Sequence, residues 1–375
     1  MEYFEKYASA SIGGSGNQLY FSTNGEVKTG KAFYRISVSG KYNYSLLFSN
    51  ITDSTYSDGK ISCKNLECKE WKIYNAYISR CKKENFNYLS EDIPNMTDTE
   101  IKGITTEDKR AITFNGNKEK TVKPGEFFSS DATGIFFEKG DYLCLEITFS
   151  GDMIPYHEES LLPLFSEEKG IFRYSKQMPV PGMIGCSRAV KKRIAFLGDS
   201  ITQGIGTPIN SYKYWNSLLS EKLSEDYSFW NLGIGYGRAN DGASDGSWLY
   251  KAKQNDIVFV CFGVNDILQG QSEEQIKEDL TSIVDILKKE NIKVILQTIP
   301  PFDYVGEDIE KWKRINNYIK NTLDKKVDLL FDNTIYLGKS EAEIHKSKYG
   351  GHPDINVCKV WSDEFYKCIK ESNIL

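Results

Sequence analysis

The hydrophobic and polar positions follow different patterns in the two halves of the chain. Up to about residue 150, short apolar runs alternate with turn residues, as in "AFYRISV", "YSLLFS", "WKIYNAYI" and "GIFFEKGDYLCLEITF". Gly140-Asp141, between two such runs, is typical of a β-hairpin, and Gly116-Asn117 indicates another turn. Helical periodicity is nearly absent, so this pattern predicts a β-sandwich or barrel.

From Arg193 onward, strand-like runs alternate with amphipathic helical segments. The predicted strands are residues 193–198, 227–233, 256–263, 293–300 and 327–332. The predicted helices are residues 212–223, 272–291 and 308–326, with a last one after Pro353. This alternation predicts an α/β fold: a five-stranded parallel sheet with helices on both faces and the flavodoxin-like strand order 2-1-3-4-5.

The change of pattern predicts two domains. A chain of 375 residues exceeds the usual size of one hydrophobic core. Residues 151–192 contain turn residues and the basic stretch "RAVKKR", and we expect an irregular connection there. The expected domains are therefore an all-β domain over residues 1–185 and an α/β domain over residues 186–375.

Composition narrows the function classes. The net charge of −5 gives no basic surface of the kind that a nucleic-acid-binding protein needs, and no apolar stretch is long enough to cross a membrane. The first residues lack the features of a signal peptide, so we expect a cytoplasmic protein, or a secreted one if a signal has been removed. The eight cysteines fit no common zinc-site spacing, and we expect free thiols, with Cys144 and Cys261 inside apolar strands. We expect neither a metal nor an organic cofactor.

Residues with reactive side chains follow the predicted strands of the second half, where ligand sites of such sheets lie. They stand in Gly198-Asp199-Ser200, in "GIGYGR" at residues 233–238, in Gly263-Val264-Asn265-Asp266 and in Gly351-His352-Pro353. Together they offer a nucleophile, oxyanion donors and a base, which are the parts of a serine esterase. Each also has an ordinary structural interpretation: Ser200, Asn265 and Asp266 could cap helices, the glycines could form tight turns, and His352 could be a surface residue.

Two further motifs are weaker candidates. Gly242-Ala243-Ser244-Asp245-Gly246 matches the G-x-S-x-G motif of α/β-hydrolases, but the polar "YGRAND" precedes it where that motif requires a buried strand. The glycines of "GIGYGR" follow a strand without completing the G-x-G-x-x-G spacing of a dinucleotide site.

The sequence also resembles a known family. "GDSITQG", "NLGIGYGR", "GVND" and the late "HP" resemble, in this order, the conserved blocks of the SGNH (GDSL) hydrolase superfamily over residues 193–375. In the first half, "LLFSN" and "RAITFNGNKEKTVKPGEFFSSD" are similar to phrases of the jelly-roll-like β-sandwich that precedes the hydrolase in some two-domain bacterial members. Carbohydrate esterase family 2, a family of deacetylases, has this order of domains.

The resemblance implies a role for each matching position. Ser200 would be the nucleophile and, through its N–H, one oxyanion donor; Asn265 would be a second donor and His352 the general base. The family glycine that completes the oxyanion hole corresponds to Tyr236, which Gly235 and Gly237 flank, so the donating N–H in this segment stays open.

The triad acid of the family is missing at its usual position. That position, three residues before His352, is Tyr349, and the resemblance to sugar deacetylases that use a Ser–His dyad implies the same arrangement here. Asp354 and Asp332 could replace the acid, but we expect Asp354 to cap the last helix and Asp332 to brace the turn after the fifth strand.

The sequence thus predicts a serine esterase, and the resemblance implies that it removes short acyl groups, in particular O-acetyl groups, from carbohydrates. The expected partner is a small-molecule or oligosaccharide ester substrate, with neither nucleic acid nor membrane involved. A thioesterase or lysophospholipase of the same superfamily and a non-catalytic carbohydrate-binding protein are the alternatives. The oligomeric state is not predicted.

Overall fold

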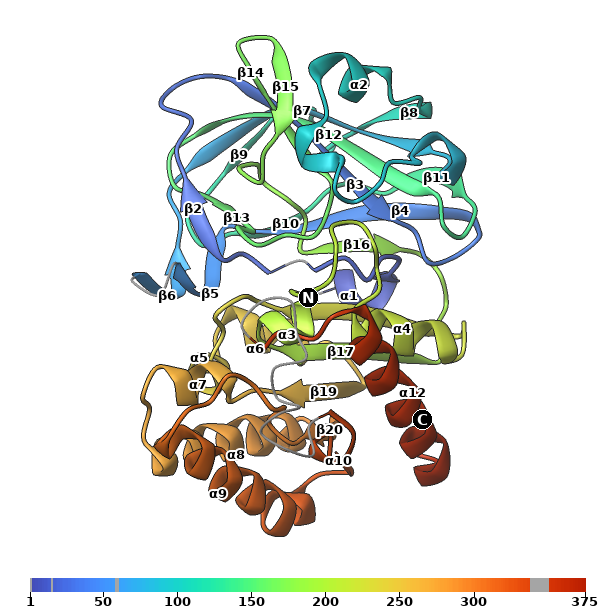
Figure 1. Ribbon diagram of the computed structural model, residues 1–375. Coiled ribbons are helices and arrows are strands. Elements are labelled where there is room, and N and C mark those ends of the chain that lie inside the picture. Colours follow the sequence, from blue (N-terminus) through green and yellow to red (C-terminus); the bar gives the residue numbers. More distant parts are fainter. Residues whose placement is uncertain (1, 15, 58–60, 338–350) are drawn as a thin grey trace. The chain divides into compact units, whose positions relative to one another are not determined.

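The computed structural model describes residues 2–14, 16–57, 61–337 and 351–375 (Figure 1). The chain divides into two compact units. The first contains most of the chain up to Val190 together with Pro208–Asn210, and the second contains Lys191–Thr207 and Ser211–Leu375. Each unit has its own sheets and its own core, described in turn below.

The first unit contains two main antiparallel sheets. In the five-stranded sheet, the order β1-β16-β4-β10 is completed by β11, which also pairs with β4. In the seven-stranded sheet, the order is β15-β14-β3-β12-β7-β8, and β9 also pairs with β7. The strands of the first sheet are β1 Ala8–Ser9, β4 Gly40–Ser49, β10 Phe127–Ser129, β11 Thr133–Phe137 and β16 Met183–Cys186. Those of the second are β3 Lys28–Arg35, β7 Trp71–Cys81, β8 Glu107–Ile112, β9 Lys120–Val122, β12 Tyr142–Gly151, β14 Leu164–Glu168 and β15 Ile171–Tyr174.

The two sheets pack against each other through alternate residues. In β12, Leu143 and Leu145 are completely buried, and the ring of Trp71 on β7 lies 6.3 Å from that of Phe128 on β10, measured between centroids. Two further strand pairs join β2 Leu19–Phe21 to β13 Ile154–Tyr156 and β5 Ile51–Ser57 to β6 Ile61–Glu67. The predicted antiparallel β-rich domain before the α/β domain is confirmed.

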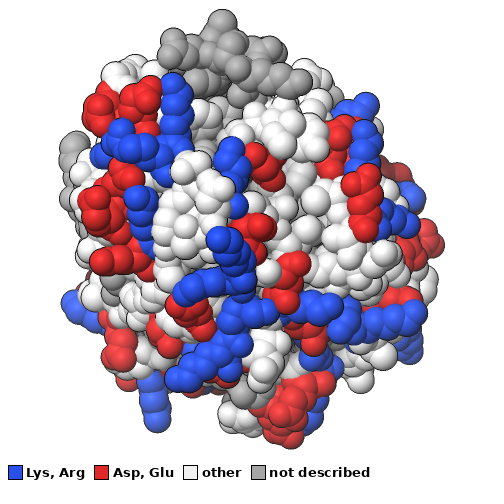
Figure 2. Space-filling view, turned by 90° about the horizontal axis from the view of Figure 1, so that it is seen from below, with Lys and Arg blue, Asp and Glu red and all other residues white. Residues whose placement is uncertain are grey.

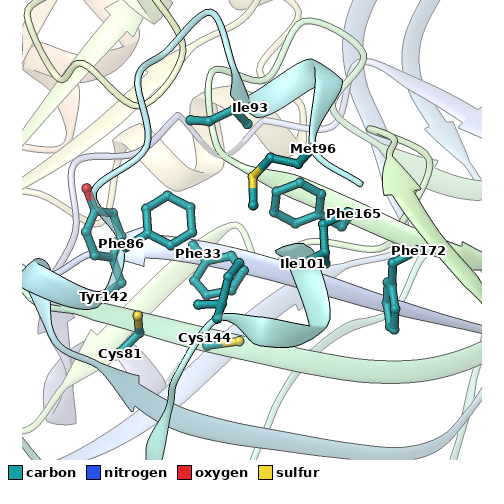
Figure 3. Close-up of a cluster of buried hydrophobic side chains, with 11 residues drawn as sticks. Phe33, Cys81, Phe86, Ile93, Met96, Ile101, Tyr142, Cys144, Phe165 and Phe172 are labelled. Carbon is teal, nitrogen blue, oxygen red and sulfur yellow. The ribbon is translucent and has the colours of Figure 1, made fainter. Parts of the chain in front are cut away.

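The opposite face of the seven-stranded sheet carries a second apolar layer (Figure 3). Phe33 on β3 and Cys144 on β12 are cross-strand neighbours whose side chains lie in a buried cluster with Phe165 and Phe172. The segment between β7 and β8 covers them with Phe86, Ile93, Met96, Ile101 and Ile104. This segment contains η1 Lys83–Asn85, η2 Ile93–Asn95 and α2 Asp98–Gly103, and α2 begins with a capping box of Thr97 and Glu100.

The expected hairpin at Gly140-Asp141 is wrong. The strand before it, β11, pairs with β4 in one sheet, whereas β12 pairs with β3 and β7 in the other. The connection therefore passes between the sheets, with Gly140 at φ +98°. The buried carboxylate of Asp141 holds it by accepting from Arg80 Nε at 2.6 Å and from the N–H of Glu138 at 2.8 Å. The turn at Gly116-Asn117 is confirmed, because the N–H of Phe114 donates to the carbonyl of Asn117.

The irregular connection expected over residues 151–192 is also wrong. This segment contains β13, β14, β15 and β16, which have three to five residues each. Strands this short, interrupted by proline and glycine, give too few alternating positions for the pattern to be recognised.

The second unit has the predicted doubly wound fold. Its five strands are all parallel, in the order β18-β17-β19-β20-β21, which is 2-1-3-4-5 in chain order. The strands are β17 Lys192–Gly198, β18 Tyr227–Gly233, β19 Ile257–Cys261, β20 Lys293–Gln297 and β21 Leu329–Phe331. Gly198 lies in register with Gly233 and Cys261, so the carboxyl ends of the three central strands meet at one edge.

Helices cover both faces of this sheet. On one face, Phe196 contacts Trp215 of α4, and Phe259 contacts Phe365 of α12, while Trp215 and Trp361 stack with centroids 5.1 Å apart. On the other face, α8 packs on β20 and on α5. The helices are α3 Ser200–Gln203, α4 Trp215–Lys222, α5 Ala239–Ala243, α6 Ser247–Ala252, α7 Val264–Leu268, α8 Glu273–Lys289, α9 Glu307–Asn321, α10 Thr334–Leu337 and α12 Ile355–Ser372.

Two general features complete the picture. On the face shown in Figure 2, lysine and arginine side chains are interspersed with aspartate and glutamate. Among the described helices, none has the length and apolar character needed to cross a bilayer. Cys144 and Cys261 are buried inside β12 and β19, as predicted.

Candidate active site

The turn from β17 into α3 presents Ser200. Its neighbour Asp199 is the N-cap residue, because the Asp199 carboxylate accepts from the N–H of Ile201 at 2.9 Å. The capping interpretation of Ser200 is therefore wrong, and its hydroxyl is directed to another partner. Gly198 allows this sharp turn, since a Cβ there would overlap Thr202 and approach the carbonyl of Cys261 to 2.5 Å.

That partner is His352. The Oγ of Ser200 and the Nε2 of His352 are 2.8 Å apart, although 152 residues separate them in sequence. His352 stands just before α12, after Gly351 with φ +89°. The structure thus brings together the predicted nucleophile and the predicted base, in hydrogen-bonding geometry.

Two residues that the sequence analysis did not single out shape the surroundings of His352. Gly206 lies against the His352–Pro353 backbone, where a Cβ would overlap the carbonyl of Pro353 and come within 3.1 Å of the Cβ of His352. The ring of Phe302 meets the imidazole edge to face, with centroids 5.1 Å apart and an interplanar angle of 82°. Phe302 follows β20, so extending the strand-end rule to the fourth strand would have found it. The contact of Gly206 has no sequence signal.

The turn at residues 234–237 lies next to the nucleophile turn. The N–H of Ile234 donates to the carbonyl of Gly198 at 3.1 Å, and the N–H of Gly237 closes the turn on the carbonyl of Ile234 at 3.1 Å. Tyr236 has φ +59°, a conformation that favours glycine. The N–H of Gly237 thus closes the turn. Which N–H of this segment donates to an oxyanion stays a prediction, with Gly235 and Tyr236 as its candidates.

Asn265 connects this turn to α7. Its Nδ2 donates to the carbonyl of Gly237 at 2.9 Å. The N-cap position of α7 is Gly263, without a side-chain cap, so the capping interpretation of Asn265 and Asp266 is wrong. A side-chain amide has two N–H donors, and the bond to Gly237 uses one of them. Asn265 can therefore hold the turn and present its second N–H to a substrate oxygen.

Two carboxyl groups are completely buried at this edge of the sheet. Burial raises the pKa of Asp199 to about 7, and the charge of Asp266 adds to the effect. Burial likewise raises the pKa of Asp266 to about 7, with the charge of Asp241 contributing. Burial also raises the pKa of Tyr304 well above its usual value, and the charges of Asp199 and Asp266 add to this effect. The low dielectric constant of such a buried region strengthens hydrogen bonds and charge interactions near it.

The two carboxylates that could replace the missing triad acid have other partners. Asp354 is the N-cap of α12 and accepts from the N–H of Val357 at 2.9 Å. Asp332 accepts from Thr298 and from the N–H of Thr334, and Lys320 lies 3.2 Å away. Both predicted structural roles are confirmed. Tyr349, which stands at the family's aspartate position, lies outside the described residues.

The alternative serine motif has none of the context that its chemistry requires. Ser244 lies at the end of α5, so a helix precedes it where a strand should, and its hydroxyl donates to the carbonyl of Asp241 at 2.6 Å. Over the described ranges, no three histidine, cysteine, aspartate or glutamate side chains are grouped so as to hold a metal ion.

Comparisons with known proteins identify the family of the second half of the chain. Residues 196–353 match the GDSL-like Lipase/Acylhydrolase family, and the second half of the chain is a domain of this family. The chain is 26% identical over 132 residues to Esterase TesA of Pseudomonas aeruginosa, a match that covers 34% of this chain and 65% of that protein.

Two solved structures that resemble the chain cover different shares of it. The psychrotrophic esterase EstA from Pseudoalteromonas sp. covers 48% of this chain with 97% of its own length, at 21% identity and a TM-score of 0.39. A family two carbohydrate esterase from Cellvibrio japonicus covers 98% of this chain with 96% of its own length, at 11% identity and a TM-score of 0.39.

Proposed function

We propose that the protein is a serine esterase that hydrolyses short acyl esters, in particular O-acetyl esters of carbohydrates, through an acyl-enzyme on Ser200. The hydrogen bond between Ser200 Oγ and His352 Nε2, 2.8 Å long, carries the proposal. A serine hydroxyl is a weak nucleophile by itself and becomes effective when an adjacent base takes its proton.

The proposed reaction has two steps. Ser200 Oγ attacks the ester carbonyl carbon while His352 Nε2 takes the hydroxyl proton, and the carbonyl oxygen becomes an oxyanion. The C–O bond to the sugar then breaks, and His352 gives its proton to the leaving alkoxide. Water, activated by His352, attacks the acyl-enzyme in the same way and releases the carboxylic acid and free Ser200.

The oxyanion is held by hydrogen-bond donors that are in place before the reaction. The proposed donors are the N–H of Ser200, the second amide N–H of Asn265 and an N–H of the 234–237 turn. The contacts from Ile234 to Gly198 and from Asn265 to Gly237 support this set, because they fix the segments that carry the donors relative to one another.

The substrate is the finer part of the proposal. Support for a carbohydrate comes from the sequence phrases of the first half, which resemble the domain before the hydrolase in two-domain bacterial members. A thioesterase or lysophospholipase would use the same catalytic parts, so a series of acyl chain lengths separates these activities.

The test is a hydrolysis panel of p-nitrophenyl acetate, butyrate and octanoate, acetylated sugars and an acyl thioester. We expect acetyl esters to be cleaved fastest, and Ser200→Ala and His352→Ala to lose hydrolysis while remaining folded. Ser244→Ala is the matched control and retains activity. Preference for the octanoyl ester or the thioester would overturn the acetylesterase assignment, and an unaffected Ser200→Ala would overturn the mechanism.

A further inference from the structure

Asp266 follows directly after Asn265 and is completely buried. Both of its carboxylate oxygens accept from one backbone N–H, that of Ala239, at 3.1 and 3.0 Å. Ala239 is the first residue of α5 and stands two residues after Gly237, whose carbonyl Asn265 binds. The adjacent residues Asn265 and Asp266 of α7 thus hold the last residue of the 234–237 turn and the residue two positions after it.

We propose that Asp266 is a positioning residue for the oxyanion hole: its carboxylate fixes Ala239, and with it the 234–237 turn that carries an oxyanion donor. This inference rests on the proposed function, because it assigns Asp266 to the same reaction. The turn is then held at both ends. At its start, the N–H of Ile234 donates to the carbonyl of Gly198. At its end, Gly237 and Ala239 are hydrogen-bonded to the side chains of Asn265 and Asp266 on α7.

The environment of Asp266 argues against a purely structural role. Burial raises the pKa of Asp266, so its ionised form is costly to the fold. Other groups that interact with Asp266 through their charge are acids: Asp241, Asp279 and Asp199. The five residues of α5 do not need the Asp266 carboxylate for their stability, because Asp241 already accepts from the N–H of Arg238, the N-cap residue, at 3.1 Å.

The backbone conformation of Tyr236 explains why the 234–237 turn needs to be held by Asp266. A tyrosine at φ +59° is disfavoured relative to extended or right-handed conformations by about 1–2 kcal/mol, so an unrestrained turn would relax away from this geometry. A donor misplaced by about 1 Å can lower the rate roughly 10²-fold. The restraint at Ala239 therefore acts on the rate more than on substrate affinity.

The test compares Asp266→Ala with Asp279→Ala. Asp279 is also a buried carboxylate, 5% exposed, but it accepts from the side chains of Asn240, Gln271 and Gln275 and leaves the backbone of the turn alone. Two quantities are measured at pH 8: kcat and KM for p-nitrophenyl acetate, and amide hydrogen exchange of the peptide covering residues 234–241. Thermal unfolding of both variants reports the loss of stability.

We expect Asp266→Ala to lower kcat about 10- to 100-fold with KM within about threefold, and to speed exchange in this peptide. Asp279→Ala keeps kcat near the wild-type value at a similar loss of stability. Unchanged exchange or unchanged kcat in Asp266→Ala overturns the positioning role, as does an equal fall of kcat in Asp279→Ala. A wild-type protein that hydrolyses no ester contradicts the proposed function instead, and the positioning role then falls with it.

Discussion

Replacing Asn265 by alanine removes two interactions of different kinds. One N–H of its amide donates to the carbonyl of Gly237 at 2.9 Å in a half-buried position, and losing such a bond costs about 1 kcal/mol of stability. The other N–H is the proposed oxyanion donor, and losing a donor of this kind lowers kcat about 10²- to 10³-fold, or about 2.7–4 kcal/mol of transition-state stabilisation. The rate should therefore fall much further than the stability.

Asn255 offers a matched control at the opposite end of the sheet. Its Nδ2 donates to the carbonyls of Lys251 and Ala252 at 3.1 and 3.2 Å, and the residue is 8% exposed, just before β19 begins. Asn255→Ala thus loses hydrogen bonds from its side chain to backbone carbonyls, and it changes no residue of the candidate active site. The assay is kcat and KM for p-nitrophenyl acetate beside the free energy of unfolding of both variants. The reasoning is refuted if Asn265→Ala keeps kcat within about threefold of wild type, or if Asn255→Ala slows the reaction as much.

Further predictions concern the acids and the strained turn. Burial raises the pKa of Asp199 to about 7, so the folded protein holds this proton more tightly than the unfolded chain and loses stability as pH rises from about 4 to 7. Asp199→Asn, which keeps a capping oxygen, should therefore raise the melting temperature more at pH 8 than at pH 4; an equal change at both would contradict this. Removing the acid of a catalytic triad lowers kcat roughly 10⁴-fold. If the protein uses a Ser–His dyad, Asp354→Ala and Asp332→Ala should lower kcat far less than this, whereas His352→Ala should lower it as much or more. A folded variant of either aspartate that is as inactive as His352→Ala contradicts the dyad. Tyr236→Gly should keep kcat within about threefold because the backbone N–H is the working group, and a large loss would show that the tyrosine side chain acts in the reaction.

The sequence predicted the strands and the long helices of the hydrolase half well because most of these segments are long enough to show their period. The helices of four to six residues, α3, α5, α6, α7 and α10, are too short for this. The strand order follows from that alternation, and the rule that sites lie at carboxyl strand ends directed attention to Ser200 and His352 before any contact was visible. Their hydrogen bond joins residues 152 positions apart, and a single sequence indicates such a contact through topology alone.

The rest depended on tertiary contacts that leave no local pattern. Gly140-Asp141 has the composition of a hairpin turn, yet the chain passes there from one sheet to the other because β11 and β12 find different partners. At the site, the sequence left open whether Ser200 caps the helix that follows it, whereas the structure assigns the cap of α3 to Asp199. The shared hydrogen bonds of Asn265 and Asp266 with the turn could not be predicted, since they depend on how closely two loops approach.

Covalent labelling is the most direct test of the central claim that Ser200 is the nucleophile. The protein is treated with a fluorophosphonate, digested, and the modified peptide identified by mass spectrometry, with Ser200→Ala and His352→Ala in parallel. We predict a single modification on Ser200 that accompanies complete inactivation, slow labelling of His352→Ala and none of Ser200→Ala. Modification of Ser244, or full inactivation with Ser200 unmodified, would contradict the account.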